Sequence, residues 1–166
     1  MKNLPSYLSD HLSGSVGALE LLENLIRSYE QEPLGLFFRE LRSDVAADKE
    51  QLEALIARLG FSESPLRKAS AWILEKFSRV KLSPDRADEN AMELFLALEA
   101  LVLGINGKNE LWRALAAASE NVAGLRSPDY SELQRRAEAQ AERVEEKRRD
   151  LARRVFAADA NPETAG

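Results

Sequence analysis

The sequence predicts an all-α protein built around a bundle of four long helices. Ala, Leu, Glu, Arg and Lys, most of which favour helices, make up 93 of the 166 residues, whereas Val, Ile and Thr, which favour strands, contribute only 12. None of the six prolines interrupts a long apolar-periodic stretch, so the prolines separate helices instead of breaking them. With 166 residues the chain is long enough to bury a hydrophobic core. Because 45% of the residues are hydrophobic, a disordered or collagen-like class of protein is excluded.

The first two helices are expected over residues 6–31 and 34–59, separated by Pro33. The second ends before Gly60, which fits the left-handed position that often follows a helix. A shorter helix is expected over 65–82, because Ser64-Pro65 resembles an N-cap followed by proline in the first turn.

The last two helices are expected over residues 88–120 and 128–157. Gly124 is predicted to end the former in the left-handed conformation, and Ser127-Pro128 to begin the latter. We expect one domain, residues 1–158, followed by a disordered tail, residues 159–166. The tail sequence DANPETAG is polar and has no periodic pattern of apolar residues.

Short connections within the first and last pairs predict two antiparallel hairpins, and the long connection predicts that helices 34–59 and 88–120 run parallel. With this connectivity the chain resembles the ferritin-like superfamily, whose fold has one long crossover connection. It is also similar to uncharacterised bacterial ferritin-like proteins in three segments, YLSDHLSGSVGALELLENLI, LRSDVAADKEQLEALIARLG and LEALVLGINGKNELWRAL. The resemblance implies a ferritin-like four-helix bundle with an extra short helix in the crossover, and no settled activity.

Metal-binding members of that superfamily use a Glu on two helices and Glu-x-x-His on the other two. Here the only histidine is His11, and no Glu-x-x-His occurs, so we expect no di-iron site and no cofactor. An all-carboxylate site remains an alternative, because hard cations accept oxygen ligands. Its candidate ligands are Glu20, Glu23, Asp44, Asp48, Glu99 and Glu138. Most lie at the flanks of the apolar stripes, where pairing with Lys or Arg is expected; for Glu99 the expected partner is Arg148.

Three polar residues interrupt apolar stripes on three different helices: Asp48, Lys108 and Gln140. In the last hairpin, the numbers of two residues that face each other should sum to about 248, and residues at the same height on the two parallel helices should differ by about 60. By this estimate Asp48, Lys108 and Gln140 lie at one level of the bundle. Two interpretations stay open. Asp48 and Lys108 face water at the stripe margins, or they form an internal salt bridge completed by Gln140, since charges inside a bundle need partners.

Four glycines also occur inside helices, Gly14 and Gly17 on the first and Gly104 and Gly107 on the fourth. Close packing of two helices explains them, or else a small-molecule pocket. The segment 65–82 is basic and amphipathic, which favours a crossover helix lying on the bundle and allows a homodimer contact or a peripheral membrane or partner-binding surface.

The remaining features limit the function. The net charge of −5 and alternating charges, with expected pairs Glu132–Arg136, Glu145–Arg149 and Asp150–Arg154, argue against nucleic-acid binding. No catalytic constellation can be assembled around His11, so we lean away from an enzyme. No secretory signal is visible, and we expect a cytoplasmic homodimer. The prediction is a non-catalytic protein of unknown biochemical role that acts in binding or assembly, and whether it has a small-molecule ligand stays open. The alternatives are a carboxylate-ligated oxidase or metal-storage protein and a peripheral membrane or partner-binding module.

Overall fold

The computed structural model describes residues 3–61 and 91–160, with the side chains of 158–160 left aside, and this part of the chain is all-α. Its helices are α1 (Leu4–Ser28), α2 (Pro33–Arg58), α4 (Ala91–Ser119) and α5 (Tyr130–Ala160), with a short 3-10 helix η2 (Ala123–Leu125) before α5. No strand occurs within the described residues. The all-α prediction is therefore confirmed. The predicted helix over 65–82 lies outside the described residues.

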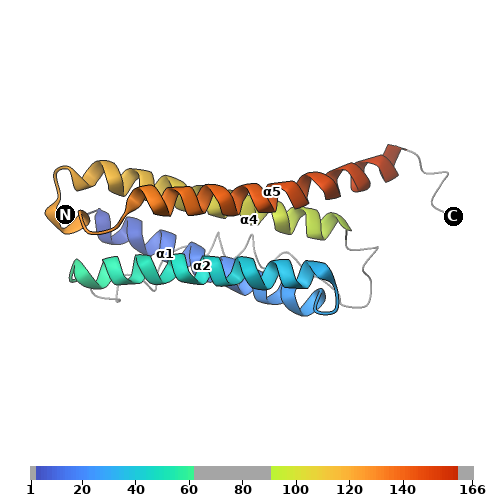
Figure 1. Ribbon diagram of the computed structural model, residues 1–166, viewed down its shortest axis with the longest axis horizontal. Coiled ribbons are helices and arrows are strands. Elements are labelled where there is room, and N and C mark those ends of the chain that lie inside the picture. The colour runs from blue at the N-terminus through green and yellow to red at the C-terminus, as the bar shows by residue number, and fades with distance from the viewer. Residues whose placement is uncertain (1–2, 62–90, 161–166) are drawn as a thin grey trace.

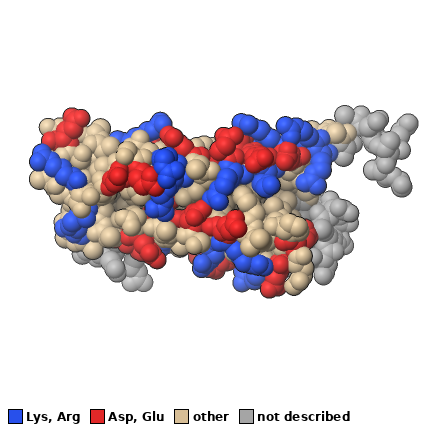
Figure 2. Space-filling model, viewed as in Figure 1, with Lys and Arg blue, Asp and Glu red and all other residues tan. Residues whose placement is uncertain are grey.

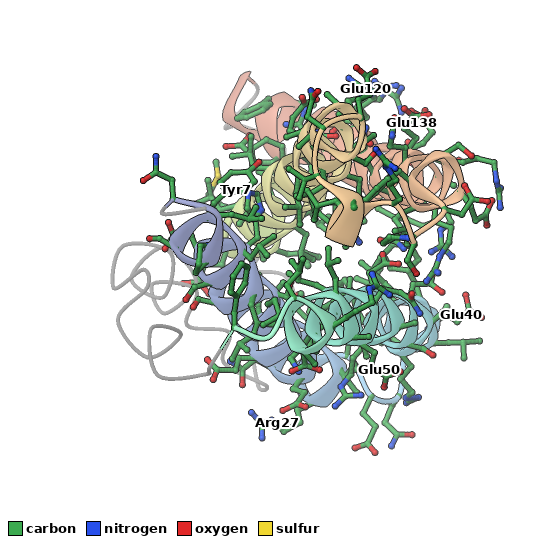
Figure 3. All side chains as sticks on the ribbon, turned by 90° about the vertical axis from the view of Figure 1, so that its left-hand side faces the viewer. Tyr7, Arg27, Glu40, Glu50, Glu120 and Glu138 are labelled. Atoms are coloured by element: carbon green, nitrogen blue, oxygen red, sulfur yellow. The ribbon has the colours of Figure 1, made fainter. Side chains whose placement is uncertain are left out.

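The four helices form two antiparallel hairpins that pack against each other (Figure 1). The largest interfaces join α1 to α2 and α4 to α5, and the hairpins meet where α1 contacts α4 and α2 contacts α5. Figure 1 also shows that α2 and α4 run in the same direction, as the long connection predicts. Seen along the bundle in Figure 3, apolar side chains fill the middle, and Glu40, Glu50 and Glu120 point outwards.

The helix ends correct several sequence predictions. Gly60 adopts φ 72° after α2, as predicted, but Gly124 does not: it lies inside η2, and Gly60 is the only positive-φ glycine among the described residues. The helix α5 begins at Tyr130 and not at Pro128, because the Asp129 side chain accepts a hydrogen bond from the Glu132 backbone N–H. It also extends to Ala160, two residues into the predicted tail; residues 161–166 are not described.

The turn between α1 and α2 requires a glycine for close approach. A Cβ at Gly35 would lie 2.1 Å from the carbonyl oxygen of Tyr29, a distance no side chain tolerates. Arg39 then reaches back to donate a hydrogen bond to the Glu30 carbonyl at 3.0 Å. These contacts hold the hairpin in the register that places α2 residues opposite α1.

The core consists of two apolar clusters, one in each half of the bundle. One surrounds Phe38 and Leu98, and the other surrounds Leu55 and Trp112. On α1, Leu8, Leu22 and Leu25 are fully buried and Gly17 and Leu21 lie on the same buried side, whereas Val16 is 39% exposed. The α1 backbone is thus aligned so that a glycine, with no side chain, faces inward at this level.

The surface mixes acidic and basic side chains, as the view in Figure 2 shows. On α5 the expected Glu145–Arg149 pair is present at 3.0 Å. The expected Glu132–Arg136 and Asp150–Arg154 pairs are wrong; Glu132 pairs with Arg135 at 2.7 Å and Asp150 with Arg153 at 2.5 Å. Among the described residues, no helix combines the length and the apolar character needed to cross a membrane.

Candidate functional site: a buried polar layer beside a cavity

Asp48 lies at the centre of the bundle, between the two apolar clusters. On α2 it falls between Val45, in one cluster, and Leu52, in the other, and its side chain is 0% exposed. The helical spacing that buries its apolar neighbours therefore buries the carboxylate too. A charge in that position must be compensated by other charges or hydrogen bonds.

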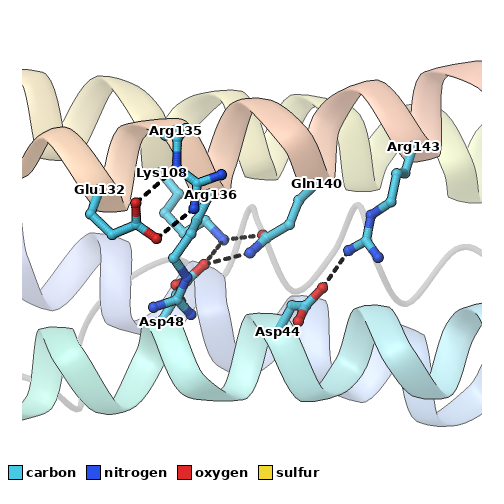
Figure 4. Close-up of polar contacts among 8 residues, drawn as sticks. All are labelled: Asp44, Asp48, Lys108, Glu132, Arg135, Arg136, Gln140 and Arg143. Carbon is cyan, nitrogen blue, oxygen red and sulfur yellow. Dashed lines mark hydrogen bonds and ion pairs between the residues drawn. The ribbon is translucent and has the colours of Figure 1, made fainter.

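Three side chains from the opposite hairpin supply that compensation (Figure 4). Lys108 Nζ donates to Asp48 Oδ2 at 2.5 Å, and Gln140 Nε2 donates to the same oxygen at 2.9 Å. Arg136 places Nη2 2.7 Å from the other oxygen, Oδ1, and forms an ion pair with it. Oδ2 therefore accepts two hydrogen bonds, whereas the buried Oδ1 has an ion-pair partner but no hydrogen-bond donor among the described residues.

Gln140 also connects the members of this layer to one another. Its Oε1 accepts a hydrogen bond from Lys108 Nζ at 2.6 Å while its Nε2 bonds Asp48. The structure therefore brings together the three residues that the register estimate placed at one level. The interpretation in which Asp48 and Lys108 both face water is wrong, since their side chains are 0% and 11% exposed.

Arg136 is a fourth member of the polar layer, which we define as Asp48, Lys108, Arg136 and Gln140. The sequence pattern predicts Glu132, one turn earlier on α5, as its partner instead. The signal that could have revealed it is spacing: Arg136 lies four residues before Gln140 and thus on the same face of the helix. Its longer side chain is 30% exposed and reaches the buried carboxylate from the bundle surface.

The polar layer contains two cations and one carboxylate, so its net charge is +1. Burial lowers the pKa of Lys108 because it disfavours the charged form, while the nearby Asp48 carboxylate opposes that shift. Arg136 adds a further, smaller lowering through charge repulsion. The ammonium of Lys108 is thus stabilised by the carboxylate of Asp48 and, more weakly, by that of Asp44, against the cost of burial and the repulsion of Arg136.

A cavity of about 420 Å³ adjoins the polar layer between α1 and α4. Asp48 and Lys108 both contribute to its wall, and most of the remaining lining residues are apolar, among them Leu52, Leu101 and Ile105. This volume is within the usual range of small-molecule sites.

Glycines account for the space in this cavity. Three of the four glycines noted in the sequence, Gly14, Gly104 and Gly107, line the cavity, whereas Gly17 does not. A Cβ built at Gly107 meets nothing within 4 Å. The helices α1 and α4, which carry these glycines, are in contact, as the close-packing explanation requires. At Gly107, however, the missing side chain leaves open space.

Two hydrogen-bond donors at the cavity wall lack acceptors among the described residues. Trp112 lines the cavity and is only 1% exposed, and its Nε1–H has no partner. An ammonium has three N–H donors, and those of Lys108 meet two acceptors, one on Asp48 and one on Gln140. Buried donors of this kind ordinarily bond to protein, water or ligand.

The lone histidine also lines the cavity. Burial lowers the pKa of His11, which favours the neutral imidazole, and its ring meets that of Tyr7 edge-on with centroids 4.8 Å apart. Ser15, also in the lining, donates its hydroxyl to the His11 carbonyl at 3.1 Å and not to the ring. No nucleophile is activated by this histidine within the described contacts.

The candidate metal ligands are spread along the bundle and most face a cation. Glu23 pairs with Arg42 at 2.7 Å, Asp44 with Arg143, and Glu138 with Arg113 at 3.2 Å, while Glu20 is exposed. Glu99 pairs with Arg148 at 3.2 Å, as expected. Across residues 3–61 and 91–160, no three acidic or histidine side chains are grouped so that they could hold a metal ion.

Comparisons of the chain with protein-family models, with curated proteins and with solved structures found no match.

Proposed function

We propose that this chain is a non-catalytic, ferritin-like bundle protein that binds a small molecule in the cavity between α1 and α4. The observation that carries the proposal is the cavity itself, a largely apolar space of about 420 Å³ that ends on a few polar groups of the bundle centre. Ligand sites in proteins have this character: an apolar lining that provides affinity and a small number of polar groups that fix orientation.

The ferritin-like part of the proposal is supported by connectivity. Two antiparallel hairpins, a long connection between α2 and α4 and the parallel direction of those helices match that fold. Polar groups gather near the middle of the bundle, where ferritin-like proteins hold metal ions. In this protein the Lys108 ammonium supplies the positive charge that faces the buried carboxylate.

Binding is favoured over metal-based oxidation or storage because of what the carboxylates do. Asp48, the most buried of the six candidate ligands, already contacts two cationic side chains and Gln140. Metal binding there would have to displace Lys108 and Arg136 and leave them with no counter-charge at the bundle centre, which is unfavourable.

The test is a fluorescence titration with N-phenyl-1-naphthylamine, an uncharged apolar probe. Gly107→Leu adds a side chain into the open space at the cavity wall, and Ala114→Leu adds the same side chain at an exposed position of the same helix. We expect the wild type and Ala114→Leu to bind the probe and Gly107→Leu to bind it about tenfold more weakly or not at all. Failure of the folded wild type to bind, or equal binding by Gly107→Leu, would contradict the proposal.

A further inference from the structure

We propose that the ligand of this cavity is an amphiphile with a single carboxylate, whose head group binds Lys108 and Trp112 and whose apolar body lies along the glycine-lined wall between α1 and α4. This inference rests on the proposed function and adds the chemical class of the ligand. It comes from three properties of the cavity: its unused donors, its charge and the character of its lining.

The unused donors require acceptor atoms on the ligand. Lys108 has one N–H beyond those given to Asp48 and Gln140, and Trp112 Nε1–H has no partner within the described part of the chain. Both residues line the cavity. A carboxylate offers two acceptor oxygens and no donor, so it can satisfy both groups without leaving a buried donor of its own.

The charge of the polar layer favours an anion over a neutral or cationic head group. Two cations face one carboxylate: Lys108 and Gln140 bond Asp48 Oδ2, and Arg136 forms an ion pair with Oδ1, which has no hydrogen-bond donor among the described residues. A bound carboxylate would bring the four-residue layer and its ligand to neutrality. A cationic ligand would add to the excess positive charge and leave both donors unbonded, which costs free energy in a buried site.

A single negative charge fits better than a phosphate. Of the described residues that line the cavity, Lys108 has an N–H and Trp112 an indole N–H without an acceptor, and the other charged lining residues are two carboxylates, the buried Asp48 and the exposed Asp10. These two carboxylates repel a doubly charged head group more strongly than a singly charged one. Phosphate groups are usually held by several donors, such as backbone N–H groups or an arginine fork. The cavity lining contains no arginine among the described residues.

The lining away from the polar layer defines the rest of the ligand. It is formed by aliphatic side chains such as Val45, Leu103 and Leu111, and by glycines that leave room for apolar groups. Burying such groups against these walls favours binding through the hydrophobic effect. An alkyl or aryl carboxylate of about ten carbons has both the size and the polarity that these walls accept.

The first experiment compares three ligands with the same ten-carbon chain: decanoate, decanol and decyltrimethylammonium, each titrated into the wild type by calorimetry. Charge-assisted hydrogen bonds to the head group should make decanoate bind at least about tenfold more tightly than decanol, with the ammonium compound weakest. Equal affinity for decanoate and decanol would overturn the carboxylate assignment.

Variants then locate the head group. Lys108→Met should abolish the preference for decanoate over decanol. Trp112→Phe, which keeps an aromatic ring and removes only the indole N–H, should weaken decanoate binding several-fold and change decanol binding less. Arg143→Gln is the matched control, because it removes a cation of α5 that does not line the cavity. Circular dichroism establishes that each variant is folded; if Lys108→Met is not, the Trp112→Phe result alone decides.

The outcomes separate this inference from the proposed function. If the uncharged naphthylamine probe binds and Gly107→Leu blocks it, but decanoate shows no preference, the cavity is a ligand site and the carboxylate class is wrong. If decanoate preference persists in both Lys108→Met and Trp112→Phe, the head group binds elsewhere and the inference is also wrong. If no probe binds the folded wild type, both proposals fail.

Discussion

Two aspartates one helical turn apart on α2, Asp44 and Asp48, make similar contacts in different surroundings. Each pairs with an arginine of α5, Asp44 with Arg143 and Asp48 with Arg136 (Figure 4). The Asp44 side chain is 42% exposed, whereas that of Asp48 is 0% exposed and also contacts Lys108 and Gln140. The sequence alone gives two acidic residues four positions apart; their burial makes them energetically different.

Burial determines how much stability an ion pair contributes and how much stability is lost when one of its partners is removed. Around Asp44, water solvates either partner if the other is removed, so the pair adds little to stability. Around Asp48, water cannot replace a missing partner, so the group left behind carries the desolvation cost. The same contact is therefore nearly optional at Asp44 and obligatory at Asp48.

The largest predicted effect is that of Asp48→Asn. The change keeps the shape of the side chain but leaves Lys108 with no counter-charge in its buried site. We expect the free energy of unfolding to fall by roughly 3–5 kcal/mol. Urea unfolding followed by circular dichroism measures it, with Asp44→Asn as the matched control on the same helix. A similar loss for the two variants would remove the distinction between the sites.

Lys108→Met should have a smaller effect, about 1–3 kcal/mol, because Arg136 and Gln140 still contact the Asp48 carboxylate. Combining it with Asp48→Leu should restore much of the stability lost in Asp48→Asn, since the remaining Arg136 can reach solvent. The double-mutant cycle made of wild type, Asp48→Leu, Lys108→Met and the double variant, measured in urea, gives the coupling free energy. Strict additivity of the two single changes would show that the residues do not act as one layer.

Asp44→Asn itself should lower the free energy of unfolding by less than about 1 kcal/mol. Its effect should also shrink as salt is added, because exposed charges are screened. Repeating the urea unfolding at low and high sodium chloride tests this point. A loss that is both large and insensitive to salt would mean that Asp44 is more enclosed than its exposure indicates.

The contrast between these two aspartates also shows what could be predicted from the sequence. Polar interruptions of apolar stripes, with loop lengths that fix the hairpin register, were enough to place Asp48, Lys108 and Gln140 at one level. The spacing of Arg136 and Gln140 places both on one face of α5, but it leaves open which carboxylate the long Arg136 side chain pairs with, because that side chain can reach over more than one turn. The choice between Glu132 and Asp48 as its partner depends on burial, which no local pattern encodes.

Other features depended on competition between local signals. Ser127-Pro128 predicts the start of α5, but the Asp129 side chain, two positions after Ser127, caps the helix instead. Gly124 predicts a helix end, but it lies inside the short helix η2. The cavity needed three-dimensional information altogether, since glycines at helical spacing predict close packing and open space equally well.

The smallest predicted effect concerns pH and again separates the buried from the exposed sites. Because burial lowers the pKa of Lys108 in the folded protein below its ordinary value of 10.5, the unfolded chain binds more protons between the two values. The free energy of unfolding contributed by Lys108 should therefore rise with pH through that window, up to about pH 10.5. The stability difference between wild type and Lys108→Met should grow as the pH rises through that window toward 10.5, as measured by urea unfolding. The difference between wild type and Arg143→Gln should stay level there, because an arginine remains charged throughout. A wild-type advantage over Lys108→Met that shrinks with rising pH would mean that the attraction of Asp48 outweighs the burial of the lysine.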